Sequence, residues 1–418
     1  MQDKWIRRVA LYLSGQTISL FGSMVVQFAI SWHVTLSTKN GAQMTIMTLC
    51  GFLPQLVIAP FAGVWADRHD RRRMIVWADA MIALSTAILA VLFMRGCDHL
   101  WLLYVISAIR SLGNGIQQPA VSALLPDIVP SEHLMRVNGI NASIQSVMML
   151  AAPAAAGMLY ARMGLQSTFW VDVATAAVGI GILMMLSVPT RVAPAAEGAS
   201  VTGDMMGGLG YVKRTRWLSQ LILFYLVYAL MFGPVVLLTP LMVARSFGEE
   251  AWRLTAHEMV FAVGSLLGGA AIGFIGDKVR NRIHLLLLGS AAFGLATLVM
   301  GFSRDFLFYL IVMGFSGLTM PLINTGVMTV LQQKIAPEFM GRVFGLISII
   351  GSAAIPLSMT IFGPLADVVS VETQLIATGA LMTAIAGYMT RFPELIEAGE
   401  PLPAPEGGEA APNKSAPT

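Results

Sequence analysis

The sequence contains little charge and little cysteine. Asp, Glu, Lys and Arg make up 12% of its 418 residues, about half their share in soluble domains, whereas 56% of the residues are hydrophobic. The two cysteines, Cys50 and Cys97, are too few for a disulfide framework. A net charge of +3 is too small to indicate a nucleic-acid partner. The composition therefore excludes an ordinary water-soluble domain and a disulfide-rich secreted domain.

Motifs for common catalytic chemistry are also missing. No lysine follows a glycine, so the chain lacks the Gly-Lys pair of a phosphate-binding Walker A loop. The patterns Gly-x-Ser-x-Gly, His-Glu-x-x-His and Cys-x-x-Cys are absent as well. We therefore expect no enzyme activity, no cofactor and no metal site, and we interpret His257-Glu258 as an interfacial pair.

Long apolar segments make up most of the chain. Twelve of them approach or exceed the length of about 20 residues that spans a bilayer. They cover residues 9–36, 43–66, 74–94, 100–125, 137–161, 166–188, 217–244, 255–276, 283–303, 306–330, 343–366 and 372–390. The first segment is much longer than a signal-peptide core, so we expect the protein to retain it. The sequence predicts an all-α membrane protein with twelve transmembrane helices.

The distribution of basic residues predicts how these helices are oriented. With twelve spans both termini lie on one side of the membrane, and 19 of the Lys and Arg residues fall on that side against six on the other. All eight tryptophans lie near the ends of the segments, where an indole ring prefers the membrane interface. We expect a multi-pass protein of a bacterial inner membrane with both termini in the cytoplasm.

Composition divides the chain into four parts. Residues 1–188 and 217–391 each hold six apolar segments and are expected to form two six-helix bundles. Residues 189–216 are rich in Pro, Ala and Gly and are typical of a cytoplasmic linker. Residues 392–418 are rich in Glu and Pro and are typical of a disordered cytoplasmic tail.

The two halves repeat short motifs at an offset of about 206 to 210 residues. Gly63-Val-Trp-Ala-Asp67-Arg68 closes the second segment, and Gly273-Phe-Ile-Gly-Asp277-Lys278 closes the eighth. Arg136-Val-Asn-Gly139 opens the fifth segment, and Arg342-Val-Phe-Gly345 opens the eleventh. Internal repeats of this kind are typical of transporters, so we expect pseudo-symmetric bundles.

Three ionisable residues lie clearly inside apolar segments: Asp79, Arg110 and Asp172. Such residues are costly in a membrane and commonly mark ion pathways, so all three are candidates for proton coupling. Depth calculated at 1.5 Å per residue leaves Arg110 within reach of either acid, and the sequence does not choose between them. A structural ion pair is the alternative for Arg110.

Two segments of the N-terminal half carry a polar face. Arg110 shares a helix face with Asn114, Gln117 and Gln118, and Gln16, Ser19, Ser23 and Gln27 share a face of the first segment. Because lipid disfavours such faces, we expect them to line a cavity. In the C-terminal half the corresponding candidates are Tyr225, Tyr228 and Phe232, with Asn324 at the repeat offset from Gln118. Aromatic groups opposite a polar wall suit a large, lipophilic, partly polar substrate, although helix packing is the alternative for this aromatic face.

The loop after the second segment carries a family signature. Gly63-x-x-x-Asp67-Arg68-x-x-Arg71-Arg72 in a six-plus-six chain resembles the major facilitator superfamily. Gly51-Phe-Leu-Pro54, Ile109-Arg-Ser111 and Lys334-Ile-x-Pro-Glu338 resemble its macrolide-efflux type of drug exporter. The chain has Asp70 where the superfamily loop usually has Gly, and Ala152-Pro153-Ala-Ala-Ala156-Gly157 departs from the antiporter motif Gly-Pro-x-x-Gly-Gly.

The resemblance implies a major facilitator fold that works by alternating access. It implies that Arg110, the arginine of the fourth span, takes part in proton coupling, and that the signature loop (Gly63, Asp67, Arg68, Arg71 and Arg72) is part of a cytoplasmic gate. In the superfamily this aspartate engages the start of a helix in the opposite half. We therefore expect two contacts, Asp67 with Arg342 and Asp277 with Arg136, when the cavity opens outward. The alternative is that these charges only fix topology.

Together these features predict an exporter of a lipophilic small molecule, such as a macrolide-like antibiotic, by proton antiport. Its partners would be the substrate, protons and the lipid bilayer, and it would function as a monomer. Export of a native metabolite such as a siderophore is the alternative within this class. A membrane enzyme or a sensor without transport activity is a further alternative, and the absence of a catalytic constellation argues against it.

Overall fold

The computed structural model describes residues 2–186 and 201–400, and the side chains of these residues except 2–4, 201–206, 208 and 277. Within these ranges the chain is helical and has no strand, as the sequence predicts. The helices of the N-terminal half are α1 (Gln2–Thr38), α2 (Gly41–Arg68), α3 (Arg71–Met94), α4 (Leu100–Ile128), α5 (Leu134–Met163) and α6 (Leu165–Met184). Those of the C-terminal half are α8 (Arg216–Met242), α9 (Ala251–Ile275), α10 (Arg282–Gly301), α11 (Phe306–Lys334), α12 (Pro337–Leu365) and α13 (Val371–Met389).

Each of these twelve helices overlaps one of the twelve apolar segments, which confirms the predicted helical organisation. Ten spans among the described residues are long and apolar enough to cross a membrane by length and composition. Short polar connections fix where the helices begin. Asn40 accepts a hydrogen bond from Gln43 N, and Asp70 accepts one from Arg73 N, so α2 and α3 start directly after their capping residues.

Two helices outside the twelve correct the sequence-based organisation. The described part of the predicted linker forms α7 (Val201–Arg214), which packs on α12 where Tyr211 stacks on Phe339. The start of the predicted tail is not disordered but forms α14 (Pro393–Ala398), whose Leu395 is buried. Asn281 and Arg282 donate hydrogen bonds to carbonyl oxygens of this segment, so its backbone is held against the C-terminal bundle. The rest of the predicted tail lies outside the described residues.

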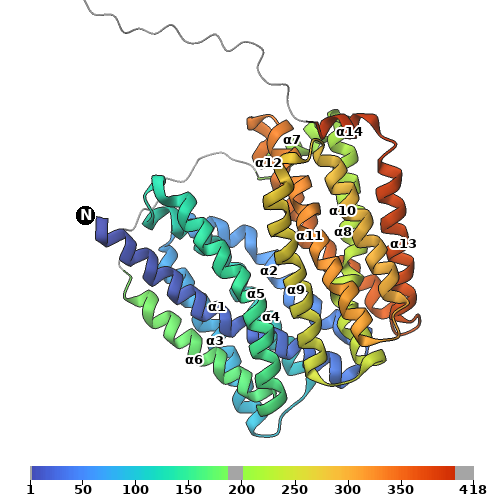
Figure 1. Cartoon of the computed structure of the whole chain (residues 1–418). Helices are drawn as coiled ribbons and strands as arrows, with labels where there is room; N and C mark the ends of the chain where they lie inside the picture. Colours follow the sequence, from blue (N-terminus) through green and yellow to red (C-terminus); the bar gives the residue numbers. More distant parts are fainter. Residues whose placement is uncertain (1, 187–200, 401–418) are drawn as a thin grey trace, which may run out of the picture.

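The main contacts between the bundles are two helix pairs, α2 with α12 and α5 with α9, and α8 adds smaller contacts with α1 and α2. These pairs correspond to each other under the internal repeat, because α2 and α9 are the second helices of their halves and α5 and α12 the fifth. The bundles diverge toward the end of the molecule that carries α7 and α14 (Figure 1). We call this end the open end, and the end with the α1–α2 connection the closed end.

Glycines on the four facing helices distinguish the two ends. At the closed end Gly41 and Gly363 contact each other across the bundles, and Gly157 contacts Thr255. At the open end Gly63, Gly139, Gly273 and Gly345 face open space. The structure is therefore closed at one end of the interface between the bundles and open at the other.

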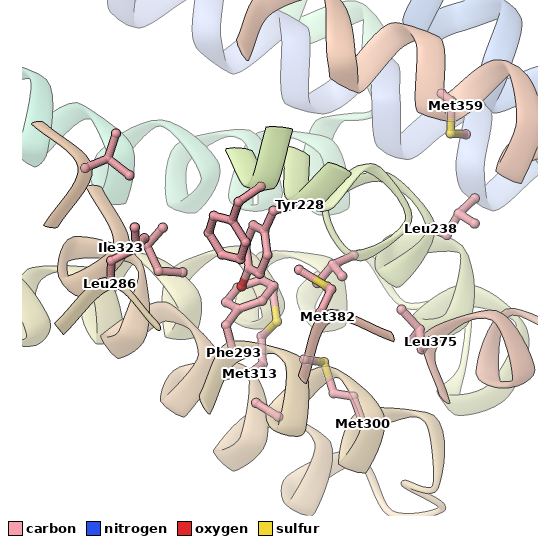
Figure 2. Packing of buried hydrophobic residues seen from close by; sticks show 14 of the residues in the cluster. Tyr228, Leu238, Leu286, Phe293, Met300, Met313, Ile323, Met359, Leu375 and Met382 are labelled. Atoms are coloured by element: carbon pink, nitrogen blue, oxygen red, sulfur yellow. The ribbon is translucent and has the colours of Figure 1, made fainter. Parts of the chain in front are cut away.

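The C-terminal bundle has the larger hydrophobic core. Tyr228 of α8 lies against Phe293 of α10, with Met313 and Met382 nearby (Figure 2). The Tyr228 hydroxyl donates a hydrogen bond to the Ser290 carbonyl oxygen at 3.2 Å. This contact satisfies the polar end of a buried tyrosine.

Candidate functional site

A buried ion pair joins α4 to α6 in the N-terminal bundle. Arg110 Nη1 donates to Asp172 Oδ2, and the two side chains are 4% and 0% exposed. The same guanidinium donates to Thr86 Oγ1 at 2.5 Å and to the Ser23 carbonyl oxygen at 3.1 Å. Of the two acids that the sequence left open, Asp172 is therefore the partner of Arg110.

The second oxygen of Asp172 extends this network to α1. Ser23 Oγ donates to Asp172 Oδ1 at 3.1 Å, so the carboxylate has a partner on each oxygen. A guanidinium on one oxygen and a hydroxyl group on the other therefore support the carboxylate. Buried charges are stable only when they are paired and hydrogen-bonded in this way.

Asp79 of α3 has a different environment. Its side chain is buried, and Oδ1 accepts hydrogen bonds from Ser19 Oγ at 3.2 Å and from Gln117 Nε2 at 2.7 Å. Its Oδ2 is buried and has no hydrogen-bond partner in the described part of the chain. No ion pair between described residues includes Asp79, so neutral groups alone support this carboxyl group.

A polar cavity of about 310 Å³ lies between α1, α4 and α5, in the half of the bundle nearer the open end. Gln16, Gln117 and Gln118, which the sequence predicts for a cavity wall, all line it. The amide nitrogen of Gln16 is buried and has no hydrogen-bond partner among the described residues. Through Gln117, which both lines the cavity and bonds Asp79, the cavity is one residue away from the buried acid.

Sequence reasoning missed the contribution of α5 to this wall. Asn138, Asn141 and Gln145 line the cavity together with Thr17 and Ser122. The three α5 residues are spaced three and four apart, which places them on one helix face. This periodicity was available in the sequence and could have identified them.

The other predicted cavity residues of the N-terminal half lie elsewhere. Ser19 and Ser23 support the two buried carboxylates and do not line the described cavity. Gln27 is exposed beside Gly51 of α2, and Asn114 is half-buried on α4. Each predicted polar face is therefore divided. Some of its residues line the cavity, some support the buried acids, and Gln27 and Asn114 do neither.

The predicted C-terminal wall is only partly accessible. Tyr228 is buried in the core of its own bundle, so in this conformation its spacing reflects helix packing, the alternative weighed from the sequence. Tyr225 and Phe232 are half-buried on α8, and Asn324 is exposed on α11. Helical spacing showed that the aromatic residues share a face, but it did not show which neighbour that face meets.

The signature loop, which joins α2 to α3, also contacts α4 and α6 at the open end. Arg71 Nη1 lies 2.6 Å from Asp127 Oδ2 of α4 and donates to the Ala123 carbonyl oxygen. Arg71 Nη2 lies 3.6 Å from Asp67 Oδ1. Arg72 Nη2 donates to the Met184 carbonyl oxygen of α6, and Arg68 is exposed. In this conformation the loop stabilises its own bundle.

Among the described side chains, no predicted contact across the bundles is formed in this conformation. Asp67 pairs with Arg71, whereas the Arg342 guanidinium lies over the Phe339 ring and beside Gly207 of α7. Arg136 is exposed, and the side chain of Asp277 lies outside the described residues. The contacts were predicted for a state that is closed at this end, so they stay predictions.

Comparisons with known proteins agree with this architecture. The Major Facilitator Superfamily model matches residues 12–359. The chain is 29% identical over 390 residues to Macrolide efflux protein A of Streptococcus pyogenes, covering 92% of this chain and 95% of that protein. It is 25% identical over 394 residues to Multidrug efflux pump Tap of Mycolicibacterium fortuitum, covering 91% and 95%. Among solved structures, a bacterial homologue of the iron transporter ferroportin superposes with a TM-score of 0.71 at 16% identity, covering 93% of this chain and 99% of that one.

Proposed function

The chain belongs to the Major Facilitator Superfamily of membrane transporters, and we propose that it exports a lipophilic, oxygen-rich small molecule in exchange for protons. The names of its relatives support efflux of macrolides or of several drugs. The positive charge bias supports a cytoplasmic location of both termini, and therefore of the open end, in a bacterial inner membrane. In this orientation the cavity receives its substrate from the cytoplasm.

The observation that carries proton coupling is the contrast between the two buried carboxyl groups. An ionised carboxylate is costly to bury unless a cation offsets it. Asp172 has Arg110 as its counter-charge, whereas Asp79 has only the neutral donors Ser19 and Gln117 on one oxygen. We therefore assign the exchanged proton to Asp79 and give Arg110–Asp172 the role of linking α4 to α6, which both pack on α1 and α3.

Gln117 provides a route by which substrate and proton can affect each other. Its amide nitrogen donates to Asp79, and the same side chain lines the cavity. A substrate that hydrogen-bonds Gln117 changes the number of donors that stabilise the ionised carboxylate. Occupation of the cavity and protonation of Asp79 are thereby linked, as binding reciprocity requires.

The chemistry of the cavity wall favours a macrolide-like substrate over an anionic siderophore. The wall consists of amides, hydroxyls and apolar groups, and none of its lining residues is charged. Such a wall recognises a ligand through hydrogen bonds and apolar contact. An anionic metal chelator would instead require cationic side chains, which bind carboxylate and similar groups strongly.

Drug accumulation in an efflux-deficient bacterium tests this function. Cells that express the wild-type chain should accumulate less macrolide than cells with an empty vector, and a protonophore should abolish the difference. Asp79→Asn should behave like the empty vector. Asp98→Asn is the matched control, because it makes the same change at an exposed loop residue outside the described cavity.

Two results would contradict the proposal in different ways. If accumulation is unchanged across macrolides and lipophilic cations, the drug is not the substrate, and export of a native metabolite becomes the leading function. If efflux persists in the presence of the protonophore, proton exchange does not drive it. Transport by Asp79→Asn at the wild-type rate under a proton gradient would remove Asp79 from the mechanism.

A further inference from the structure

Arg245 links the two bundles at the closed end. It lies in the π-helical turn Val243–Phe247 that follows α8, and it reaches the α1–α2 connection of the other bundle. Its Nε and Nη2 donate to the Lys39 carbonyl oxygen at 2.9 and 2.6 Å. Nη1 donates to the Ala366 carbonyl oxygen at 2.6 Å, and Nη2 lies 3.0 Å from Asp367 Oδ1. One guanidinium therefore contacts both halves of the chain.

Asp367 completes the connection by capping a helix of the opposite bundle. Its Oδ1 accepts the N–H of Gly41 at 2.7 Å, and its Oδ2 accepts the N–H of Ala42 at 2.9 Å. These are the first amides of α2, where a helix has unpaired donors and a partial positive charge. The carboxylate thus pairs with Arg245 and with a helix N-terminus at once. The Arg245 and Asp367 side chains are 29% and 24% exposed, so solvent screens this pair less than a fully exposed one.

The internal repeat supplies a comparison within the same molecule. At the α2–α12 contact, Gly363 is pressed against the hydroxyl of Thr45, and at the α5–α9 contact Gly157 is pressed against the hydroxyl of Thr255. The two threonines lie 210 positions apart and the two glycines 206, so both contacts obey the repeat. Both interfaces therefore close through the same small-residue packing.

Only one of the two interfaces carries the charged cluster. No ion pair or hydrogen bond between described residues joins α5 to α9, whereas Arg245 and Asp367 join α12 and the end of α8 to α2. Close packing of the helices does not require the cluster, because the α5–α9 contact forms without it. Its polar groups must therefore affect something other than local packing.

We propose that Arg245 and Asp367 form an outer latch that sets the equilibrium between the inward-open and the outward-open state. Opening toward the outside separates the bundles at the closed end. This movement removes the contacts of Arg245 with Lys39 and leaves the N–H groups of Gly41 and Ala42 without their carboxylate acceptor, although Asn40 still caps α2 through Gln43. Four charge-assisted hydrogen bonds of Arg245 and Asp367 to the other bundle are lost in one step: two to the Lys39 carbonyl oxygen and one each from the N–H groups of Gly41 and Ala42. Only the effect of the latch on transport rests on the proposed function, because the contacts that form the latch depend on the conformation alone.

Cysteine labelling in nanodiscs tests the latch without substrate or proton gradient. In a background with Cys50→Ser and Cys97→Ser, two reporters are used separately, Thr45→Cys at one interface and Thr255→Cys at the other. A water-soluble maleimide reacts with either position when the closed end separates. Arg245→Ala and Asp367→Asn should each raise the labelling rate at both positions about fivefold or more, the change that one lost charge-assisted hydrogen bond produces in an equilibrium.

Matched variants separate a latch from a local effect. Arg253→Ala should leave both rates unchanged, because Arg253 lies on the same surface but pairs with Glu250 of its own bundle at 2.8 Å. Arg245→Lys should fall between wild type and Arg245→Ala, since an ammonium keeps a charge with fewer fixed donors. A third reporter, Ser290→Cys, is buried inside the C-terminal bundle and should stay protected in every folded variant.

The outcomes decide the proposal. Faster labelling at both positions supports a latch that acts on the whole interface. Faster labelling at position 45 alone would overturn it, because Asp367 would then be only a local cap of α2. Unchanged labelling at both positions would also overturn it. If Arg245→Ala exposes position 290, the comparison is made on Arg245→Lys and Asp367→Asn. A chain that exports no drug would still give a clear labelling result, so failure of the transport function is distinguishable from failure of the latch.

Discussion

The two buried aspartates should respond differently to replacement by asparagine. Asp172→Asn should mainly lower the stability of the protein, whereas Asp79→Asn should mainly abolish the coupling of drug transport to protons. Asp172→Asn removes the acid that pairs with Arg110 and leaves a guanidinium in a site where the arginine is 4% exposed. Breaking a buried ion pair from one side costs about 3–5 kcal/mol. Asp79→Asn keeps an oxygen that can accept from Ser19 and Gln117, so its cost should be about 1 kcal/mol or less.

Two assays on the same purified proteins separate these effects. Thermal unfolding in detergent should place Asp172→Asn well below wild type and Asp79→Asn close to it. In proteoliposomes the order should be reversed. The coupling of drug transport to protons should be close to wild type in Asp172→Asn and well below wild type in Asp79→Asn. Asp79→Asn should move drug only down its own gradient and should not respond to an imposed pH gradient, because its side chain cannot take up and release a proton.

A double variant protects this reasoning against simple misfolding. Arg110→Met combined with Asp172→Leu replaces the ion pair with apolar groups of similar volume, which commonly restores stability. If this variant is stable and still couples drug to protons, the ion pair is structural only. Our reasoning would be refuted if Asp172→Asn were as stable as wild type, or if Asp79→Asn kept full proton coupling.

Three further predictions concern other parts of the molecule. Asp67→Arg and Arg342→Asp should each lower export, and the double charge swap should restore part of it. The export rate is measured for all three variants. A double swap that exports no faster than the single variants would count against the cytoplasmic contact. Asn141→Ala should raise the KM for an oxygen-rich drug about fivefold through loss of one hydrogen bond, and an unchanged KM would remove α5 from the binding wall. Leu395→Ala should lower the free energy of unfolding by about 2–5 kcal/mol because Leu395 is fully buried. Glu394→Ala loses an exposed pair with Arg216 and a hydrogen bond from Gln220 at 3.3 Å, so it should change the free energy of unfolding by about 1 kcal/mol or less. Denaturant or thermal unfolding of the two α14 variants checks this difference. Equal losses of unfolding free energy in both variants would contradict it.

The sequence predicted the helices well because membrane spans depend on a local property. An apolar segment long enough to cross a bilayer must form a helix to satisfy its backbone hydrogen bonds. The amphipathic helix α7 and the short helix α14 lack this signal. They are helical because Tyr211 and Leu395 pack on the C-terminal bundle, and that partner surface exists only in the folded protein.

The sequence identified the ionisable residues of the site but not which of them form an ion pair. Buried charge identified Arg110, Asp79 and Asp172, yet depth along the membrane left both acids within reach of the arginine. The choice of Asp172 depends on how α6 is rotated toward α4, which no local pattern encodes. Arg245 shows the same limit, because in the sequence it is only one of six basic residues on the outer side, and its partner Asp367 lies 122 positions away.

Direct measurement of proton movement tests the central claim most closely. Proteoliposomes that contain the chain and a pH-sensitive dye are given a drug gradient with no initial pH gradient. Proton antiport predicts that drug moving in one direction drives protons in the other, and that Asp79→Asn abolishes the dye signal while drug still equilibrates. Drug movement in the wild-type chain without any proton movement would contradict the account.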